Sequence, residues 1–267
     1  MAKTNKKLKG LDVPGSPGTV GFGYAALGLF SLLAYPGLAL AGPPFLTDDP
    51  EPVPYQHHEV TIATQQTKTA DGRTGTLPAL EYNYGALPDL QLHIVVPYAF
   101  NNPTDGANHN GLGDIELGAK YRFLQETDSR PMMGVFPIVV TSTGDADKGL
   151  GNRDTQLFLP LWLQKKWGEW QSYGGGGYWI NNAADGKNHW FFGWQLQREI
   201  TEHLTLGGEI FYSTEKAPGE GSSTGFNLGG SYNFDEHNHL LFSAGRGLSN
   251  IDATNQFSSY IAYQWTW

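Results

Sequence analysis

Apolar and polar residues alternate along much of the chain. In the stretch DIELGAKYRF, residues 114–123, every odd-numbered position is apolar, and four of the five even-numbered positions are charged. The stretches HLTLGGEIFY, residues 203–212, and FNLGGSYNF, residues 226–234, repeat the pattern with small residues mixed in. Successive side chains of a strand point to opposite faces. The alternation therefore predicts strands with one apolar and one polar face.

Twelve stretches of this kind predict twelve strands, and ten is the alternative count because PMMGVFPIVV and HLLFSAGRG alternate weakly. The stretches cover residues 56–66, 76–85, 90–101, 113–125, 131–142, 155–166, 169–181, 189–200, 203–214, 224–234, 238–248 and 256–267. Pro97, Pro137 and Pro160 each remove a donor from the sheet, so they predict bulges or weak pairing.

The connections between these strands alternate in length. Long, turn-rich segments such as TKTADGRTG and TSTGDADKGLGNRD follow the odd-numbered strands, and short ones such as ITEH follow the even-numbered strands. Outer-membrane barrels have long loops outside the cell and short turns in the periplasm. We therefore predict an all-β fold, a transmembrane antiparallel up-and-down β-barrel with both termini periplasmic.

Composition supports a membrane location. Glycine numbers 35, aromatics reach 13%, and charged residues are only 16%, against about a quarter in soluble domains. No segment after residue 41 approaches the ~20 apolar residues of a membrane helix. A closed barrel is the other structure that leaves no backbone group unpaired in lipid.

The first 41 residues are typical of a signal peptide. Four lysines precede an apolar run from about Val20 to Leu40, and small residues stand at Ala39 and Ala41. This pattern predicts cleavage after Ala41, with an uncleaved membrane anchor as the alternative. Residues 42–55 would form a periplasmic N-terminal segment, either an extension or a small plug in the barrel mouth. Residues 56–267 would form the barrel.

Charge and cysteine content exclude several functions. The net charge of −9 argues against a nucleic-acid partner. The chain has no cysteine, which excludes disulfides, thiolate metal sites and a cysteine nucleophile. Paired histidines, at 57 and 58 and at 237 and 239, are interpreted as surface residues rather than metal ligands. We expect no metal and no cofactor.

The C-terminal stretch YIAYQWTW indicates where the barrel ends. Tyr263, Trp265 and Trp267 share one face of the last strand, and aromatic residues are enriched at membrane interfaces. We predict that they contact lipid at the periplasmic interface and form the signal that the outer-membrane assembly machinery recognises. Tryptophans 167, 170, 179 and 190, at other strand ends, are assigned to the same aromatic girdles.

Three acidic loop residues, Asp105, Asp145 and Asp147, raise the possibility of divalent-cation bridges to lipopolysaccharide. Simple solvation of these loops is the alternative. The glycine run in YGGGGYW, residues 173–179, lacks the helix and the lysine of a phosphate-binding loop. We interpret it as a place where the wall curves or where bulky neighbours lie flat against it.

Several stretches of the chain resemble a known family. GPPFLTDDPEPV follows the cleavage site, GLGDIELGAKYRF lies in the fourth predicted strand, GEIFYSTEK in the ninth and LLFSAGRGLS in the eleventh. They are similar to the outer-membrane transporter family described as "Putative MetA-pathway of phenol degradation", and the similarity extends over almost all of the mature chain. The resemblance implies a Gram-negative outer-membrane barrel associated with uptake of aromatic or other small compounds. It implies no particular binding residues.

The polar strand faces supply the candidate functional residues. If the apolar faces contact lipid, charged side chains point into the lumen, where they tune selectivity. The lumen-lining candidates are Glu59, Glu81, Asp114, Glu116, Lys120, Arg122, Glu209 and Arg246. About twelve strands give a lumen between one filled by side chains and an open channel. Both a narrow pore and a plugged barrel are therefore compatible with the pattern.

These features favour a channel for passive uptake of a small solute, which is aromatic or hydrophobic if the resemblance extends to function. A structural or adhesive barrel without a pore is the alternative. A lipid-modifying enzyme is less favoured, because no H-E-x-x-H pattern occurs. Ser243 and His239 lie about 13 Å apart by strand rise, too far for a nucleophile and its base.

Overall fold

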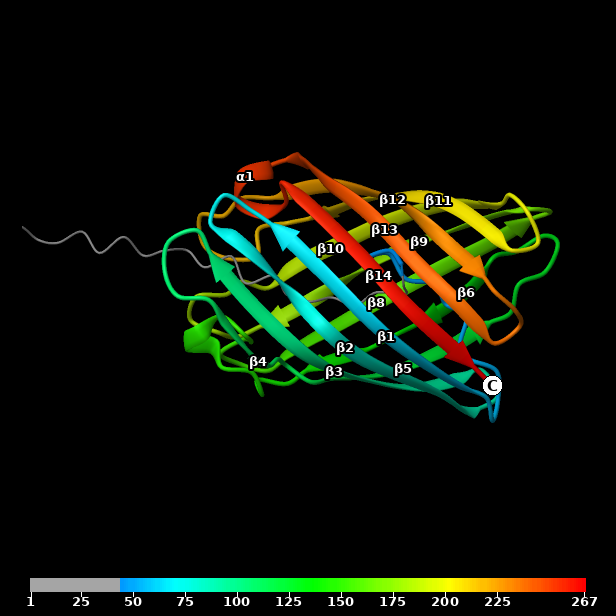
Figure 1. The fold of residues 1–267 in the computed structure, drawn as a ribbon. Coiled ribbons are helices and arrows are strands. Elements are labelled where there is room, and N and C mark those ends of the chain that lie inside the picture. The colour runs from blue at the N-terminus through cyan, green and yellow to red at the C-terminus, as the bar shows by residue number, and fades with distance from the viewer. Residues whose placement is uncertain (1–43) are drawn as a thin grey trace, which may run out of the picture. The chain divides into compact units, whose positions relative to one another are not determined.

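The computed structural model describes residues 44–267, which form a closed antiparallel β-barrel (Figure 1). The predicted signal peptide, with Ala39 and Ala41, lies outside the described residues. The barrel closes because the first strand pairs with the last, in a register that runs from Glu59 opposite Thr266 to Lys68 opposite Phe257. The sheet therefore has no open seam between its first and last strands, as a lipid environment requires.

Fourteen strand segments build the wall. They are β1 (His58–Lys68), β2 (Gly72–Leu87), β3 (Leu90–Pro103), β4 (His109–Leu112), β5 (Glu116–Leu124), β6 (Met132–Val135), β7 (Ile138–Val140), β8 (Gln156–Trp167), β9 (Trp170–Asn181), β10 (His189–Glu199), β11 (Leu204–Ser213), β12 (Ser223–Asn233), β13 (Asn238–Ser249) and β14 (Phe257–Thr266). A short 3₁₀ helix, η1 (Ala146–Lys148), and a short helix, α1 (Ile251–Thr254), lie in connections.

These segments make up twelve barrel strands, as the alternation predicts. Segments β4 and β5 both pair with β3 and together form the fourth barrel strand. Segments β6 and β7 both pair with β5 and β8 and form the fifth. Phe136 and Pro137 separate β6 from β7, which is the interruption expected where proline removes a backbone donor. Pro160, in contrast, lies within an unbroken strand opposite Gly177.

The connections mostly follow the predicted alternation. At one end, which we call the loop end, β7 and β8 are joined through residues 141–155 and β11 and β12 through residues 214–222. At the other, the turn end, two residues join β2 to β3 and two join β8 to β9. The predicted loop TKTADGRTG is an exception. Strands β1 and β2 extend into it and leave only residues 69–71 outside the strands.

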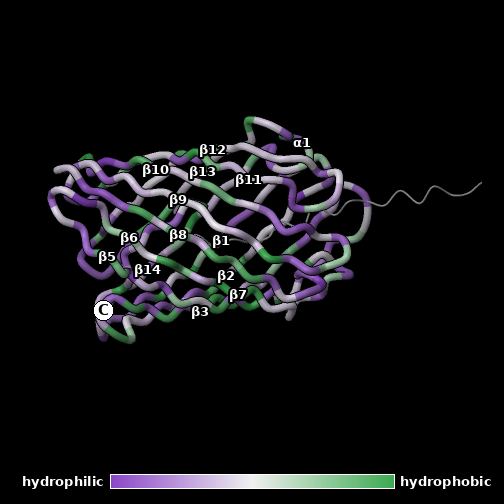
Figure 2. The backbone as a smooth tube through the Cα atoms, turned by 180° about the vertical axis from the view of Figure 1, so that it is seen from behind, coloured by the Kyte–Doolittle hydropathy of each residue, from purple (hydrophilic) through white to green (hydrophobic). Residues whose placement is uncertain are grey.

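The outer face of the barrel is apolar. Side chains on alternate positions of each strand are about half exposed, and hydrophobic residues recur along the strands between polar connections (Figure 2). Examples from strands around the barrel are Ile62, Leu92, Leu117, Tyr121, Trp194, Ile210, Leu228 and Ile261. No helix among residues 44–267 is long and apolar enough to cross a membrane. The expected lipid-facing alternation is thus present.

The C-terminal aromatic residues lie on this outer face beside the seam between β1 and β14. Tyr263, Trp265 and Trp267 are all exposed, and the rings of Trp265 and Trp267 stack at 4.2 Å. Trp267 also stacks on His58 at 5.0 Å. Trp179 corrects the girdle assignment, because it is only 4% exposed and points into the lumen. Trp179 lies an even number of residues from inward-facing Tyr173 on the same strand, so both side chains point inward. The glycines between them hide this alternation in the sequence.

Residues 44–57 contain no strand; we call them the plug. Residues 44–53 lie within the barrel, and residues 54–57 are exposed at its turn end. Of the two forms predicted for residues 42–55, an extension or a plug, the contacts of the described part favour the plug. Phe45, Thr47 and Asp48 are almost completely buried. A segment this polar can be buried because lumen side chains satisfy its backbone, as described next.

Candidate functional site

Glu209 on β11 holds one end of the plug. Its carboxylate accepts hydrogen bonds from the backbone amides of Leu46 and Thr47, at 2.9 and 2.8 Å, and from the Thr47 hydroxyl at 2.6 Å. Asn227 donates to the same carboxylate at 2.6 Å. Such charge-assisted bonds are stronger than neutral ones. Glu209 therefore fixes a turn of the plug near the middle of the barrel.

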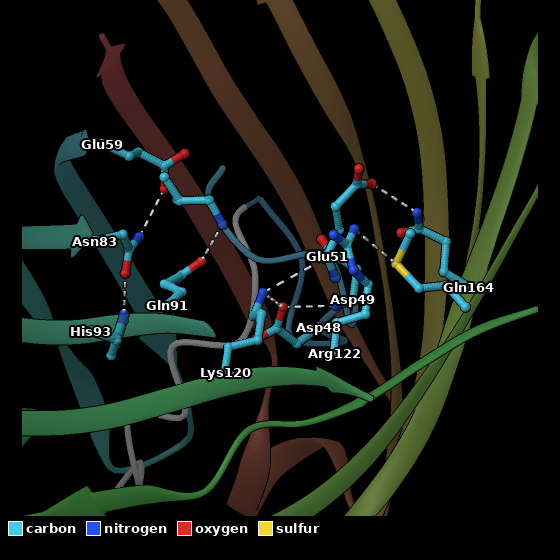
Figure 3. A network of polar contacts seen from close by, with 12 residues as sticks. Asp48, Asp49, Glu51, Glu59, Asn83, Gln91, His93, Lys120, Arg122 and Gln164 are labelled. Atoms are coloured by element: carbon cyan, nitrogen blue, oxygen red, sulfur yellow. Dashed lines mark hydrogen bonds and ion pairs between the residues drawn. The ribbon is translucent and has the colours of Figure 1, made fainter. Parts of the chain in front are cut away.

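Lys120 on β5 holds the plug through its acidic residues. Its ammonium lies 2.9 Å from Asp48 and 3.6 Å from Asp49 (Figure 3). Burial raises the pKa of Asp49 to about 6, and the neighbouring Asp48 and Glu51 add to the rise while Lys120 opposes it. The buried lysine therefore faces two carboxyl groups that compete for one positive charge.

Further contacts continue toward the turn end. Glu51 accepts from Gln164 at 2.9 Å and pairs with Lys166 at 3.3 Å. Burial alone would raise the pKa of Glu51, but the Gln164 hydrogen bond and the Lys166 charge lower it overall. The Val53 amide donates to the Gln91 side chain at 2.8 Å. Each of these partners is a side chain of the barrel wall.

Small residues let the plug lie against the wall. A Cβ added at Gly193 would come within 2.1 Å of the Thr47 hydroxyl, and one at Gly85 within 1.9 Å of the Pro54 carbonyl oxygen. Gly193 pairs with Gly175 on the neighbouring strand, so a bare patch of wall faces the plug. These glycines serve close approach between two segments of backbone.

A cavity of about 600 Å³ opens beside the plug at the turn end; we call it the turn-side cavity. Its walls are mostly charged or polar. Asn83 donates to both Glu59 and Glu81 at 2.8 Å, and its Oδ1 accepts from His93 Nδ1 at 2.7 Å. The other ring nitrogen of His93 lies 3.0 Å from Glu116. Figure 3 shows this network converging from β1, β2 and β3.

Asn83 is central to this network. With both of its amide protons directed at the carboxyl groups of Glu59 and Glu81, its oxygen is left as the acceptor for His93 Nδ1. His93 Nε2 lies within hydrogen-bond distance of Glu116. Sequence reasoning missed His93, which is the inward residue of an apolar stretch, LHIVVP. Its cross-strand partner Asn83, and Glu116, two residues from its other partner Gly118, were the only signal.

Toward the loop end the lumen is aromatic. Phe136, Ile138, Val140, Phe158, Trp162, Trp179 and Phe191 form a buried cluster, and Leu46 of the plug and Phe211 pack against it. The glycine run makes this packing possible. A Cβ at Gly175 would lie 3.1 Å from the Trp162 ring, and one at Gly177 2.6 Å from Phe158. The interpretation that bulky neighbours lie flat against these glycines is supported on both faces of the wall, since Gly174 similarly adjoins Trp194.

A cavity of about 120 Å³ lies between this cluster and the loops; we call it the loop-side cavity. Trp179, Phe191 and Phe211 form part of its wall, with Leu46 contributed by the plug and Lys216 by the loop after β11. It shares no lining residue with the turn-side cavity. The plug, from Leu46 to Asp48, contributes to both, so it stands between them.

The loop between β7 and β8 is anchored to the barrel by Asp114. This carboxylate accepts from the Gly144 amide at 2.9 Å, and from the Asn152 amide and side chain at 2.6 and 2.7 Å. Leu150 from the same loop is 5% exposed and lines a small cavity of about 40 Å³ against β3. Asp114 therefore serves loop anchoring rather than an open pore surface.

The structure places seven of the eight lumen candidates on the inner face: Glu59, Glu81, Asp114, Glu116, Lys120, Arg122 and Glu209. Arg122 pairs with Asp89 at 2.6 Å near the turn end. Arg246 is a correction. On β13, Leu241 and Ser243 are buried, so Arg246 falls on the outer, exposed face with Leu248. Both faces of HLLFSAGRG carry apolar residues, and the pattern could not assign an inner side.

The described residues offer no clear catalytic or metal centre. No group of three or more histidine, aspartate or glutamate side chains among residues 44–267 is placed to hold a metal ion. Ser243 donates to the Pro44 carbonyl oxygen, and His239 bonds Asn233 instead of Ser243. A G-x-S-x-G pattern does occur at residues 221–225, but it runs into β12 without the following helix of a nucleophile elbow.

Comparison with known proteins agrees with this architecture. The family model described as "Putative MetA-pathway of phenol degradation" matches residues 65–264. The chain belongs to this family. The resemblance noted in the sequence is therefore confirmed. No curated protein matches the chain.

Several solved structures of other proteins have a fold similar to that of this chain. An outer membrane channel from Pseudomonas putida F1 superimposes with a TM-score of 0.70 at 15% identity, covering 82% of this chain and 98% of that one. The KdgM porin, in complex with disordered oligogalacturonate, gives a TM-score of 0.53 at 11% identity over 77% and 98% of the two chains. The NanC porin gives 0.52 at 7% identity over 78% and 98%. The chain thus has the fold of an outer-membrane β-barrel.

Proposed function

We propose that the protein is a passive channel for a small aromatic or hydrophobic solute in the outer membrane of a Gram-negative bacterium, and that movement of the plug opens it. The turn end, which carries the C-terminus, would face the periplasm, and the loop end the outside of the cell. The family and the channels and porins that share the fold support this proposal.

The observation that carries the proposal is the way the plug is held. None of its residues belongs to a strand, and most of its bonds to the wall run through side chains such as Glu209, Lys120 and Gln91. Water and solute can replace such bonds one at a time, whereas displacing a strand would open the barrel itself. Withdrawal of the plug would join the loop-side and turn-side cavities while the wall stays intact.

Planar-bilayer recording tests the proposal directly. The full-length protein should show small or infrequent conductance steps, and deletion of residues 45–53 should give larger and longer ones. Arg246→Gln is the matched control, because Arg246 lies on the outer face and touches no plug residue. If the deletion variant is fully folded by heat-modifiable gel migration and remains silent, the barrel is a structural element without a pore and the channel is refuted.

Lumen charge should set the selectivity of the open channel. Neutralising Lys120 or Arg122 in the plug-deleted barrel removes positive charge from the inner face, so the reversal potential in a salt gradient should shift toward cations. An unchanged reversal potential for both variants would place the ion path elsewhere. Flux that follows the concentration gradient alone, in vesicles without any energy source, would identify passive transport.

Two proposed partners concern the membrane. Tyr263, Trp265 and Trp267 would engage the outer-membrane assembly machinery before they face lipid, and deleting Trp267 should lower the amount of barrel in the membrane. Bridging of lipopolysaccharide by loop aspartates has less support from the geometry. Asp145 pairs with Lys148, and Asp147 pairs with Arg153 at 3.0 Å, so both charges already have protein partners.

A further inference from the structure

The loop-side cavity has walls unlike the rest of the lumen. Three rings stand nearly parallel in one row: Phe158 and Trp179 stack at 4.6 Å with 13° between planes, and Trp179 and His189 at 5.9 Å with 11°. Phe191 and Phe211 form a second, adjoining pair at 6.5 Å and 23°. Trp179 is the middle ring of the row, with Phe158 and His189 against its two faces, so a planar ligand can meet it only at its edge. Aromatic pairs favour such edge-to-face contacts.

The size of the cavity matches one ring. Its volume is about 120 Å³, close to the ~150 Å³ of an apolar protein cavity that accepts benzene. The plug limits its depth, because Leu46 belongs to its lining and packs against the aromatic cluster. A single substituted benzene ring therefore fits, whereas a sugar would place many hydroxyls against apolar walls.

Two opposite charges stand at the polar side of the cavity. Lys216 and Glu220 both line it, from the loop between β11 and β12. Neither side chain forms a hydrogen bond or ion pair with another of residues 44–267. Burial lowers the pKa of Lys216, against the weaker attraction of Glu220. The other cation of the lining, Arg153, already pairs with Asp147 and Asp185.

We propose that this cavity is a binding site for a small aromatic carboxylate, whose ring packs edge-to-face against Trp179 and whose carboxylate pairs with Lys216. A bound carboxylate gives the partly buried ammonium the partner that the protein does not supply. Glu220 opposes binding and limits the affinity, as suits a site from which a solute must leave again. The inference deepens the proposed function, since it rests on the barrel conducting solute past this site.

Equilibrium dialysis of radiolabelled benzoate against the purified full-length barrel in detergent micelles tests the site. Benzoate should bind more tightly than benzamide, which lacks the charge, and more tightly than cyclohexanecarboxylate, which lacks the flat ring. Tighter binding of benzylamine than of benzoate would overturn the proposal, because it would make the cavity a site for aromatic cations.

Two loop variants should act in opposite directions. Lys216→Gln should weaken benzoate binding about tenfold, the loss of one charge-assisted contact, and Glu220→Gln should strengthen it a few-fold by removing repulsion. Lys187→Gln is the matched control. Lys187 pairs with Glu215 in the same region but does not line the cavity. Equal binding by the wild type and the Lys216→Gln variant would refute the role of Lys216.

Trp179→Leu examines the aromatic wall. It should lose about tenfold in benzoate affinity while binding of cyclohexanecarboxylate stays the same, because leucine offers no aromatic edge for a ring to pair with. An equal loss for both ligands would refute the aromatic contact. Conductance separates this inference from the proposed function. A barrel that conducts but binds no benzoate keeps the channel and refutes the site, and one that binds benzoate but never conducts does the reverse.

Discussion

The two ends of the lumen are lined by the same twelve barrel strands, but different interactions hold their side chains in place. Around the loop-side cavity, Phe158, Trp162 and Trp179 pack as the core of a soluble domain does, and glycines on β9 make room for them. Around the turn-side cavity, Glu59, Glu81, Glu116 and His93 are instead held by hydrogen bonds and charge. The first region is specified by shape and the second by partners.

The difference determines what each region tolerates. A packed aromatic cluster resists change in volume but is insensitive to pH and salt. A buried polar network accepts small shifts in position but depends strongly on the charge of each member. The plug connects the two, with Leu46 in the first and Asp48 in the second. We expect perturbations of the two regions to differ in kind as well as in size.

The largest effect should come from removing volume at the loop-side region. Trp162 is 1% exposed, so Trp162→Ala should lower the free energy of unfolding by about 3–5 kcal/mol, measured by urea titration of the barrel in lipid vesicles. Trp194→Ala is the control, because that ring faces outward toward lipid. Equal destabilisation by both variants would mean that the lumen cluster is not a packed core.

Removing charge from the turn-side region should release the plug. Lys120→Met leaves Asp48 and Asp49 without their cation, and an uncompensated buried charge costs about 3–5 kcal/mol. The plug can avoid this cost by leaving the lumen, so the open probability in planar bilayers should rise. Adding Asp48→Asn and Asp49→Asn should restore closure. A triple variant as open as Lys120→Met alone would contradict the electrostatic explanation.

A substitution at Gly193 tests the effect of steric contact on the plug without changing any charge. Gly193→Val places a side chain where the Thr47 hydroxyl lies, because even a Cβ would approach it to 2.1 Å. Overpacking of this kind costs about 1–3 kcal/mol and should loosen the plug while every charge is retained. Conductance should increase less than for Lys120→Met. Gly193→Val combined with Thr47→Gly should return to wild-type conductance, and failure to do so would implicate the wall itself.

The smallest effect expected is a pH dependence confined to the plug. The raised pKa of Asp49, about 6, means that the docked plug favours its protonated form. Docking is therefore strongest below the ordinary aspartate pKa of 3.8 and weakens as the pH rises through about 6. The titratable groups facing it are Lys120, Asp48, Glu51, Glu59 and Tyr173.

The open probability should consequently be lower at pH 5 than at pH 7.5. Asp49→Asn should remove most of this difference, because asparagine does not titrate. A difference that persists in this variant would assign the pH dependence to the strand carboxylates and His93 instead.

The same contrast explains what the amino-acid sequence reveals. Where one face is charged, as in DIELGAKYRF, period-two alternation assigns inner and outer sides correctly, and Glu116, Lys120 and Arg122 all lie inside. On β8, LFLPLWL is apolar on both faces because one side packs against lipid and the other against the lumen cluster. Alternation has no contrast there, so the aromatic cluster and the cavity it lines could not be predicted.

Contacts between residues far apart in the chain likewise could not be predicted from the sequence. Glu209 was a lumen candidate from its strand alone, but its role as the acceptor for Leu46 and Thr47 joins residues more than 160 positions apart. The two aspartates of TDDPEP left both an extension and a plug open. Only the position of Lys120 opposite them decides between these alternatives. Strand count and facing follow from local pattern, whereas what fills the lumen follows from which strands the closure brings together.

The pairing of β1 with β14 also imposes an order on construction. The plug immediately precedes β1, and β1 pairs with β14, so forming this row of hydrogen bonds encircles a segment that was synthesised before any strand of the barrel. After encirclement the plug can leave only lengthwise, through one of the two mouths. A chain that closes around an empty lumen would have to thread the same segment afterwards through a finished ring. The plug is therefore most easily placed in the lumen during assembly, before β1 pairs with β14.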